Sequence, residues 1–158
     1  MSKREQVECV VKAVSLGNPG PSGWGAVFSK GKCSSEMSGV AGHSSNNRAE
    51  LLAVCRSIKT ITARSRVSVF TDSGYVVDGV TQHLEAWKRN GWRTLKNKPL
   101  AHSDLWQELV RLTRRHEVEF FLIKHHGCPL DAGRAYKLAA RRARKIASSK
   151  NAKKRSIL

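Results

Sequence analysis

Apolar positions in the first half of the chain fall in short, partly alternating runs that are typical of β-strands. Residues 7–14 form one such run, and the glycines and prolines of residues 17–23 are typical of a turn. Two further strands are predicted at residues 24–28 and 34–40, as a hairpin-like pair. A short apolar run at residues 67–71 predicts a fourth strand.

In most of the remaining chain, apolar residues recur at the spacing of α-helices. Four helices are predicted from it, at residues 47–61, 76–88, 103–115 and 131–147. Asn46 or Asn47 is the expected N-cap of the first helix and Ser103 that of the third. A fifth strand is predicted at residues 117–123. The order β-β-β-α-β-α-α-β-α indicates the α/β class, with a five-stranded mixed sheet flanked by helices.

The length of 158 residues predicts one domain. Residues 1–6 are a polar N-terminal segment, residues 7–147 the expected domain and residues 148–158 a basic, flexible tail. No run reaches the roughly 20 apolar residues of a membrane span, and no apolar signal core follows the N-terminus. The four cysteines include no CxxC pair, which favours free thiols over a zinc site. We therefore expect an intracellular reducing compartment, cytoplasm or organelle matrix, and neither secretion nor a membrane partner.

The net positive charge is the feature of the composition that says most about the binding partner. The chain has 29 Lys and Arg against 12 Asp and Glu, a formal net charge of +17. Ten of the basic residues and no acidic residue lie in residues 132–158. Such an excess favours a polyanionic partner, of which nucleic acid is the commonest, with an anionic membrane surface as the competitor.

Several blocks, in their order and spacing, resemble type 1 ribonuclease H of the bacterial kind over about residues 7–147. They are LGNPGPSGWGA at 16–26, NNRAEL at 46–51, TDSGYV at 71–76, WKRNGWRT at 87–94 with Lys96, Lys98 and Pro99, and LW at 105–106. The resemblance implies an RNase H-like fold in which residues 87–99 form a basic protrusion, the handle. It also implies hydrolysis of the RNA strand of RNA–DNA hybrids by two divalent ions, held by four carboxylates.

Two of these four carboxylate positions match the family and two do not. Glu50 and Asp72 match the second and third ligands, and His126 matches the family's mobile histidine. Lys12 stands at the first position and Tyr136 at the last. An ammonium about 4 Å from a divalent ion would repel it by several kcal/mol at an intermediate dielectric. We therefore expect the Lys12 ammonium within ion-pair distance of Glu50 or Asp72, in place of a cation.

This substitution pattern predicts a pseudoenzyme with no functional catalytic residue, no metal and no cofactor. The charge then suggests an RNA-binding structural subunit of a ribonucleoprotein such as a ribosome, with RNA, RNA–DNA hybrids and ribosomal proteins as partners. One alternative is an active ribonuclease H with a degenerate metal site, in which Glu50, Asp72 and His126 act with one Mg²⁺. Another is an accessory domain that binds hybrids.

Nucleic-acid contacts are expected at three places that the resemblance and the charge indicate. They comprise Asn18, Ser45, Asn46 and Asn47 near the first helix, Lys88, Arg89, Trp92, Arg93, Lys96 and Lys98 in the handle, and Arg141, Arg142, Arg144 and Lys145 in the last helix. The asparagines and Ser45 could also serve only as turn and cap residues, and the lysines only as a solvated surface.

Overall fold

Three long strands at the start of the chain pair antiparallel in sequence order. They are β1 (Glu5–Ser15), β2 (Gly20–Lys30) and β3 (Cys33–Ser44). Strand β4 (Ser65–Thr71) pairs parallel with β1, and β5 (Glu117–Leu122) pairs parallel with β4. The resulting order, β3-β2-β1-β4-β5, confirms the predicted five-stranded mixed sheet.

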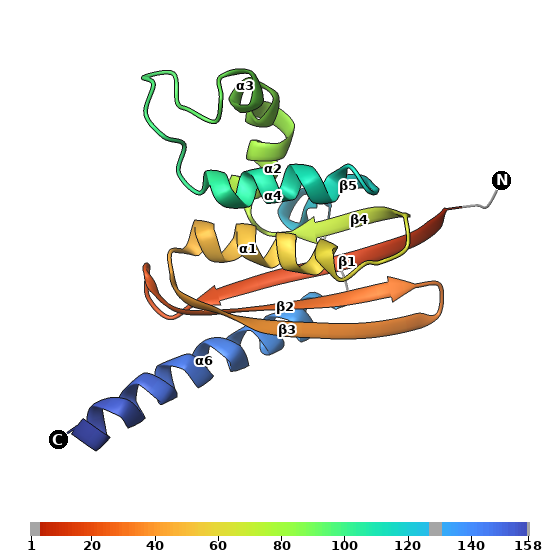
Figure 1. Ribbon diagram of the computed structural model, residues 1–158. Helices are drawn as coiled ribbons and strands as arrows, with labels where there is room; N and C mark the ends of the chain where they lie inside the picture. The colour runs from red at the N-terminus through yellow and green to blue at the C-terminus, as the bar shows by residue number, and fades with distance from the viewer. Residues whose placement is uncertain (1–3, 127–130, 158) are drawn as a thin grey trace.

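Helices cover both faces of this sheet in the computed structural model, which describes residues 4–126 and 131–157, apart from the side chains of 125, 126 and 150–157. They are α1 (Asn46–Lys59), α2 (Gly74–Asp78), the π-helical turn η1 (Gly79–His83), α3 (Leu84–Arg89), α4 (Ser103–Thr113), α5 (Ile123–His126) and α6 (Ala132–Ile157). Helices α1 and α4 lie on one side of the sheet, and α6 crosses the other side (Figure 1). Within the described residues, no helix is long and apolar enough to span a bilayer.

Alternation along β1 divides the core between these two faces. Cys9 and Val11 belong to the larger cluster, together with Leu51 of α1 and Trp106 of α4. Val10 points the other way and joins the smaller cluster beneath α6. By the same alternation, Lys12 lies on the α6 face.

Two glycines of β2 let α6 lie directly on the sheet. A Cβ on Gly23 would come 2.5 Å from the carbonyl oxygen of Ala139, and a Cβ on Gly25 would come 2.5 Å from that of Ala135. Gly25 is the register partner of Lys12. Helix α6 therefore closes the β2 side of Lys12.

Several helix boundaries differ from the prediction. Ser45, not Asn46 or Asn47, caps α1, because its hydroxyl accepts a hydrogen bond from the Arg48 amide at 3.2 Å. The N-cap of α4 is His102, with a positive φ of 59°, and Ser103 is the first helical residue.

The predicted helix at 76–88 and the predicted end of the last helix also differ. The former is three consecutive segments, in which the π-helical turn begins at Gly79. The last helix, α6, continues to Ile157, whereas its end was predicted near residue 147. No glycine or proline follows Gly133, and alanine, lysine and arginine are strong helix formers, so nothing local ends the helix.

Candidate active site

An ion pair between Lys12 and Asp72 lies where β1 and β4 end. Val11 and Thr71 are the last register partners of these parallel strands, so Lys12 and Asp72 follow side by side. The Nζ atom of Lys12 donates to Oδ2 of Asp72 at 2.7 Å. The Lys12 side chain is 15% exposed and that of Asp72 is 50% exposed. The prediction that Lys12 pairs with one of the two carboxylates is confirmed.

Glu50 completes this cluster from the second turn of α1, where it is half-buried. Burial raises the pKa of Glu50, and nearby Asp72 acts in the same direction. A hydrogen bond with the Ser73 side chain and the charge of Lys12 oppose that rise in pKa without cancelling it. The charges of Asp72 and Lys12 therefore both act on the ionisation of the Glu50 carboxyl.

Neither Tyr136 nor Asp131 adds a carboxylate here. Tyr136 of α6 is 54% exposed and carries a phenol at the position of the family's last ligand. The carboxylate of Asp131 accepts a hydrogen bond from the Ser29 hydroxyl at 3.4 Å. Ser29 pairs with Glu8, four residues before Lys12 on β1, so Asp131 lies toward the opposite end of the strand.

The residues expected at the start of α1 are brought together. Oδ1 of Asn18 accepts a hydrogen bond from the Asn46 amide at 2.9 Å, which ties the β1–β2 loop to the helix. Asn46 and Asn47 are exposed, and Asn47 precedes Glu50 by about one helical turn. Nucleic acid in contact with Asn47 would thus lie next to Glu50.

Sequence reasoning missed a neighbouring cluster around Arg48. Its guanidinium bonds both carboxylate oxygens of Asp104, at 3.2 and 2.8 Å, and lies 3.3 Å from Nδ1 of His102. This hydrogen bonding lowers the pKa of Asp104, while burial and then Arg48 lower that of His102. The more than 50 residues between partners leave no local signal, although the NNRAEL block does place Arg48 beside the site.

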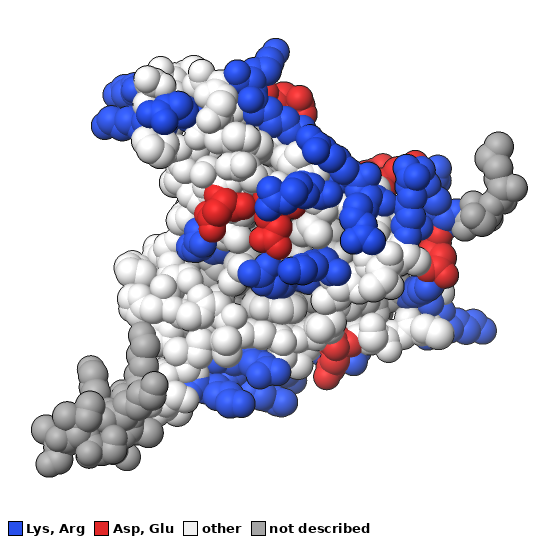
Figure 2. All heavy atoms as spheres, viewed as in Figure 1, with Lys and Arg blue, Asp and Glu red and all other residues white. Residues whose placement is uncertain are grey.

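The handle exposes most of its predicted contact residues. Arg89, Arg93, Lys96 and Lys98 are exposed, whereas Lys88 pairs with Glu85 at 3.1 Å. Trp92 is half-buried against the main core, which leaves less of its ring for a ligand. Basic side chains gather over this protruding segment and along α6 (Figure 2).

The predicted residues of α6 lie on its outer surface with one exception. Arg141, Arg144 and Lys145 are exposed, while Nε of half-buried Arg142 donates to the Ser38 hydroxyl at 3.0 Å. His126 lies in α5, but its side chain and residues 127–130 are outside the described residues.

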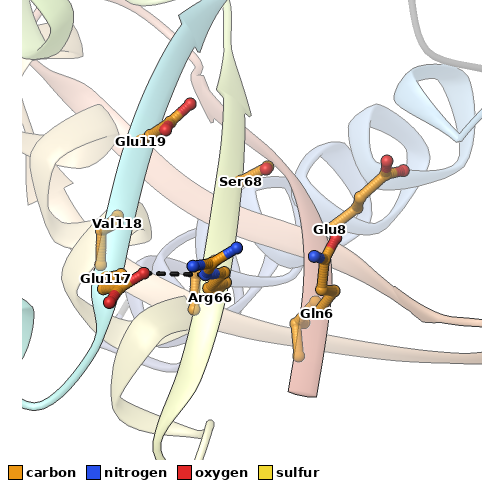
Figure 3. A pocket seen from close by; sticks show the side chains of 9 residues that line it. Gln6, Glu8, Arg66, Ser68, Glu117, Val118 and Glu119 are labelled. Atoms are coloured by element: carbon orange, nitrogen blue, oxygen red, sulfur yellow. Dashed lines mark hydrogen bonds and ion pairs between the residues drawn. The ribbon is translucent and has the colours of Figure 1, made fainter. Parts of the chain in front are cut away.

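A hollow of about 650 Å³ lies away from this cluster. Its walls come from the first halves of β1, β4 and β5, and the Nε of Arg66 bonds Oε2 of Glu117 at 2.9 Å there (Figure 3). Lys12 and Asp72 follow the opposite, carboxyl ends of β1 and β4. The hollow is therefore not part of the candidate site.

The residues present do not fit a pair of divalent ions. Within the described part of the chain, no group of three or more His, Cys, Asp or Glu side chains could hold a metal. Glu50 and Asp72 supply two carboxylates, and the Lys12 ammonium is bonded to one of them.

A family model, named relatives and a solved structure that are similar to this chain are all ribonucleases H. The RNase H family model matches residues 4–144. A protein named ribonuclease H from Novosphingobium aromaticivorans is 39% identical over 136 residues, covering 86% of this chain and 95% of the relative. Another from Marinobacter nauticus is 42% identical over 130 residues, covering 82% and 88%. The crystal structure of LC9-RNase H1, a type 1 RNase H with the type 2 active-site motif, superposes with a TM-score of 0.79 at 25% identity, covering 92% of this chain and 75% of that one.

These relatives overturn the main functional prediction. Proteins about 40% identical over most of the chain are named ribonuclease H, so the interpretation as a pseudoenzyme and ribosomal subunit is wrong. They point to an enzyme. The expectation of no cofactor is wrong for the same reason, because ribonucleases H are metal-dependent.

Proposed function

The chain belongs to the ribonuclease H family, and from this we propose that it hydrolyses the RNA strand of RNA–DNA hybrids with a metal site that keeps two of the family's four carboxylates. The observation that carries the proposal is that Asp72, directly after β4, acts electrostatically on the carboxyl of Glu50, in the second turn of α1. Solved proteins of the same fold have been captured with an RNA/DNA hybrid, among them LC11-RNase H1.

The exposed asparagines beside the carboxylates support this substrate. Asn46 and Asn47 offer amide donors and acceptors to a sugar–phosphate backbone, and Asn18 holds the start of α1 in place. A strand held by Asn47 would present its phosphates to Glu50 about one turn further along α1.

Two basic surfaces would provide further phosphate contacts. The first is the handle surface, Arg89, Arg93, Lys96 and Lys98, and the second is the α6 surface, Lys137, Arg141, Arg144 and Lys145. Their cations would neutralise phosphates whatever the nucleotide sequence. An enzyme that hydrolyses hybrids of any sequence requires such contacts.

We also propose a reducing intracellular compartment. Cys9, Cys33 and Cys55 are free thiols, and burial raises the pKa of Cys9 and Cys55, which keeps both protonated and unreactive.

A cleavage assay tests the activity. Highly purified protein with Mg²⁺ or Mn²⁺ should cleave a labelled RNA strand paired with DNA, and should leave the same strand intact when it is single or paired with RNA. The double variant Glu50→Gln, Asp72→Asn, purified identically, should lose this cleavage, which controls for contaminating nucleases. Equal cleavage by wild type and variant would contradict the proposal.

A further inference from the structure

Helix α6 continues beyond the part of the chain that the RNase H family model covers. The family match ends at residue 144, whereas α6 ends at Ile157. Ala143 is the last buried residue among the α6 side chains that the structure describes, and Arg144 and Lys145 after it are exposed. Residues 144–157, which we call the α6 arm, add about 21 Å of helix, and this helix extends past the sheet (Figure 1).

The α6 arm leaves the sheet at the end where the candidate site lies. Ala135 packs on Gly25, the register partner of Lys12. Ala143 packs on Gly23, whose register partner lies two residues further along β1. Helix α6 therefore runs past Lys12 toward the carboxyl end of β1, and the arm continues in that direction.

The handle projects at the same end from the opposite face of the sheet. The chain leaves the handle at His102, whose Nδ1 lies 3.3 Å from the Arg48 guanidinium in the first turn of α1. The bond between Asn46 and Asn18 ties that turn to the loop that follows β1. Figure 1 shows the handle and the α6 arm on either side of the end of β1, with α1 and α4 on one face of the sheet and α6 on the other. The candidate site therefore lies between two projections.

The α6 arm is strongly basic and has no acidic residue. Its six cations are Arg144, Lys145, Lys150, Lys153, Lys154 and Arg155. A helix that lies in a membrane surface needs an apolar face with large side chains, whereas the large apolar residues of the arm are only Ile146 and Ile157. The composition of the arm therefore fits the phosphates of a nucleic acid better than a lipid bilayer.

We propose that the α6 arm is a second binding arm for the hybrid, which is contacted by the handle on one side of the site and by the arm on the other. This proposal rests on the proposed function and names its preferred substrate, a long hybrid. Lys150 follows Leu138, which packs on Gly25 beside Lys12, by about 18 Å of helix. Phosphates of one duplex strand lie about 3.4 Å apart along the axis, so only a hybrid that continues about five base pairs beyond the site reaches Lys150.

Hybrid affinity as a function of length tests this proposal with the full chain. An arm variant replaces four cations with glutamine, a strong helix former, and leaves the α6 surface intact. Its changes are Lys150→Gln, Lys153→Gln, Lys154→Gln and Arg155→Gln. A matched control variant removes the same charge from exposed residues near the amino ends of β1, β4 and β5, opposite the site. Its changes are Lys32→Gln, Lys59→Gln, Arg64→Gln and Arg114→Gln.

Fluorescence anisotropy in EDTA, at about 0.1 M salt, measures binding without hydrolysis. The arm variant should bind a hybrid of about 24 base pairs about tenfold or more weakly than wild type, because phosphate contacts are lost. It should bind a hybrid of about 8 base pairs within about threefold of wild type, and the control variant should stay within about threefold on both.

Unchanged affinity of the arm variant for the long hybrid would overturn the proposal, as would equal losses on both lengths or in the control variant. Weaker binding of the arm variant to phosphatidylserine vesicles, with hybrid affinity unchanged, would assign the arm to a membrane and overturn it too. Hydrolysis by wild type together with unchanged affinity of the arm variant would refute this inference alone. Arm-dependent binding of the long hybrid without hydrolysis in Mg²⁺ or Mn²⁺ would refute the proposed function alone.

Discussion

The indole of Trp106 lies directly against Gly79, so that a Cβ on Gly79 would come 2.1 Å from Cη2 of the ring. Trp106 is fully buried, and its Nε1 donates to the hydroxyl of Tyr75 at 3.1 Å, so the ring has little room to move. We predict that Gly79→Ala destabilises the protein by about 1–3 kcal/mol through overpacking. Chemical denaturation monitored by circular dichroism measures this change.

Gly74→Ala is the matched control for that substitution. Gly74 opens α2, and a Cβ there would meet no atom within 4 Å. Alanine should therefore leave the free energy of unfolding unchanged or raise it slightly. Equal losses in the two variants would contradict the role given to Trp106.

The ion pair between Lys12 and Asp72 should contribute measurably to stability. In a double-mutant cycle of Lys12→Met and Asp72→Asn, we expect a coupling free energy of about 1 kcal/mol, at the upper end for partly exposed pairs, that decreases in high salt. If the double variant loses as much stability as the two single variants together, the coupling free energy is zero and the pair is not formed in solution.

Stability should depend on pH through Glu50. Because burial raises the pKa of its carboxyl above the ordinary 4.5, its favourable contribution is complete at pH below that value and is lost as pH rises through the folded-state pKa. Glu50→Gln should therefore unfold at a higher temperature than wild type at pH 7, with the difference shrinking toward pH 4. A variant that is less stable than wild type at pH 7 would refute this.

Nucleic-acid affinity should depend on salt through the α6 surface. Replacing Arg141, Arg144 and Lys145 with glutamine should reduce the slope of log K against log salt by about 2–3 for hybrid binding, since each phosphate contact contributes roughly 0.7–0.9. Lys32→Gln, in the exposed β2–β3 turn, should leave the slope unchanged. Fluorescence anisotropy at several salt concentrations measures it, and an unaltered slope in the triple variant would exclude these contacts.

The spacing of apolar residues predicted most strands and helices, because each element buries one face and so repeats apolar residues at its own period. Short apolar runs, some of them alternating, located all five strands, and the family motifs predicted an ion pair of Lys12 with Glu50 or Asp72, of which the structure shows the pair with Asp72. The close packing of Gly79 on Trp106 escaped prediction because Trp106 lies 27 positions further along the chain. The Arg48–Asp104 pair was missed for the same reason.

The functional prediction failed at a different step. The loss of carboxylates at Lys12 and Tyr136, added to a charge of +17, suggested a binding protein without activity. Charge reports affinity for a polyanion and says nothing about the reaction that follows. The indication of an enzyme came from relatives about 40% identical over most of the chain, which are named ribonuclease H.

Single-turnover cleavage of a labelled RNA–DNA hybrid, measured across a range of Mn²⁺ concentrations, tests the central claim most directly. The account predicts cleavage of the RNA strand that rises with Mn²⁺, and that falls by about a hundredfold or more in Glu50→Gln, Asp72→Asn, because groups that stabilise developing charge contribute about that much. No cleavage by wild type at any Mn²⁺ concentration, from protein that binds the hybrid, would contradict it.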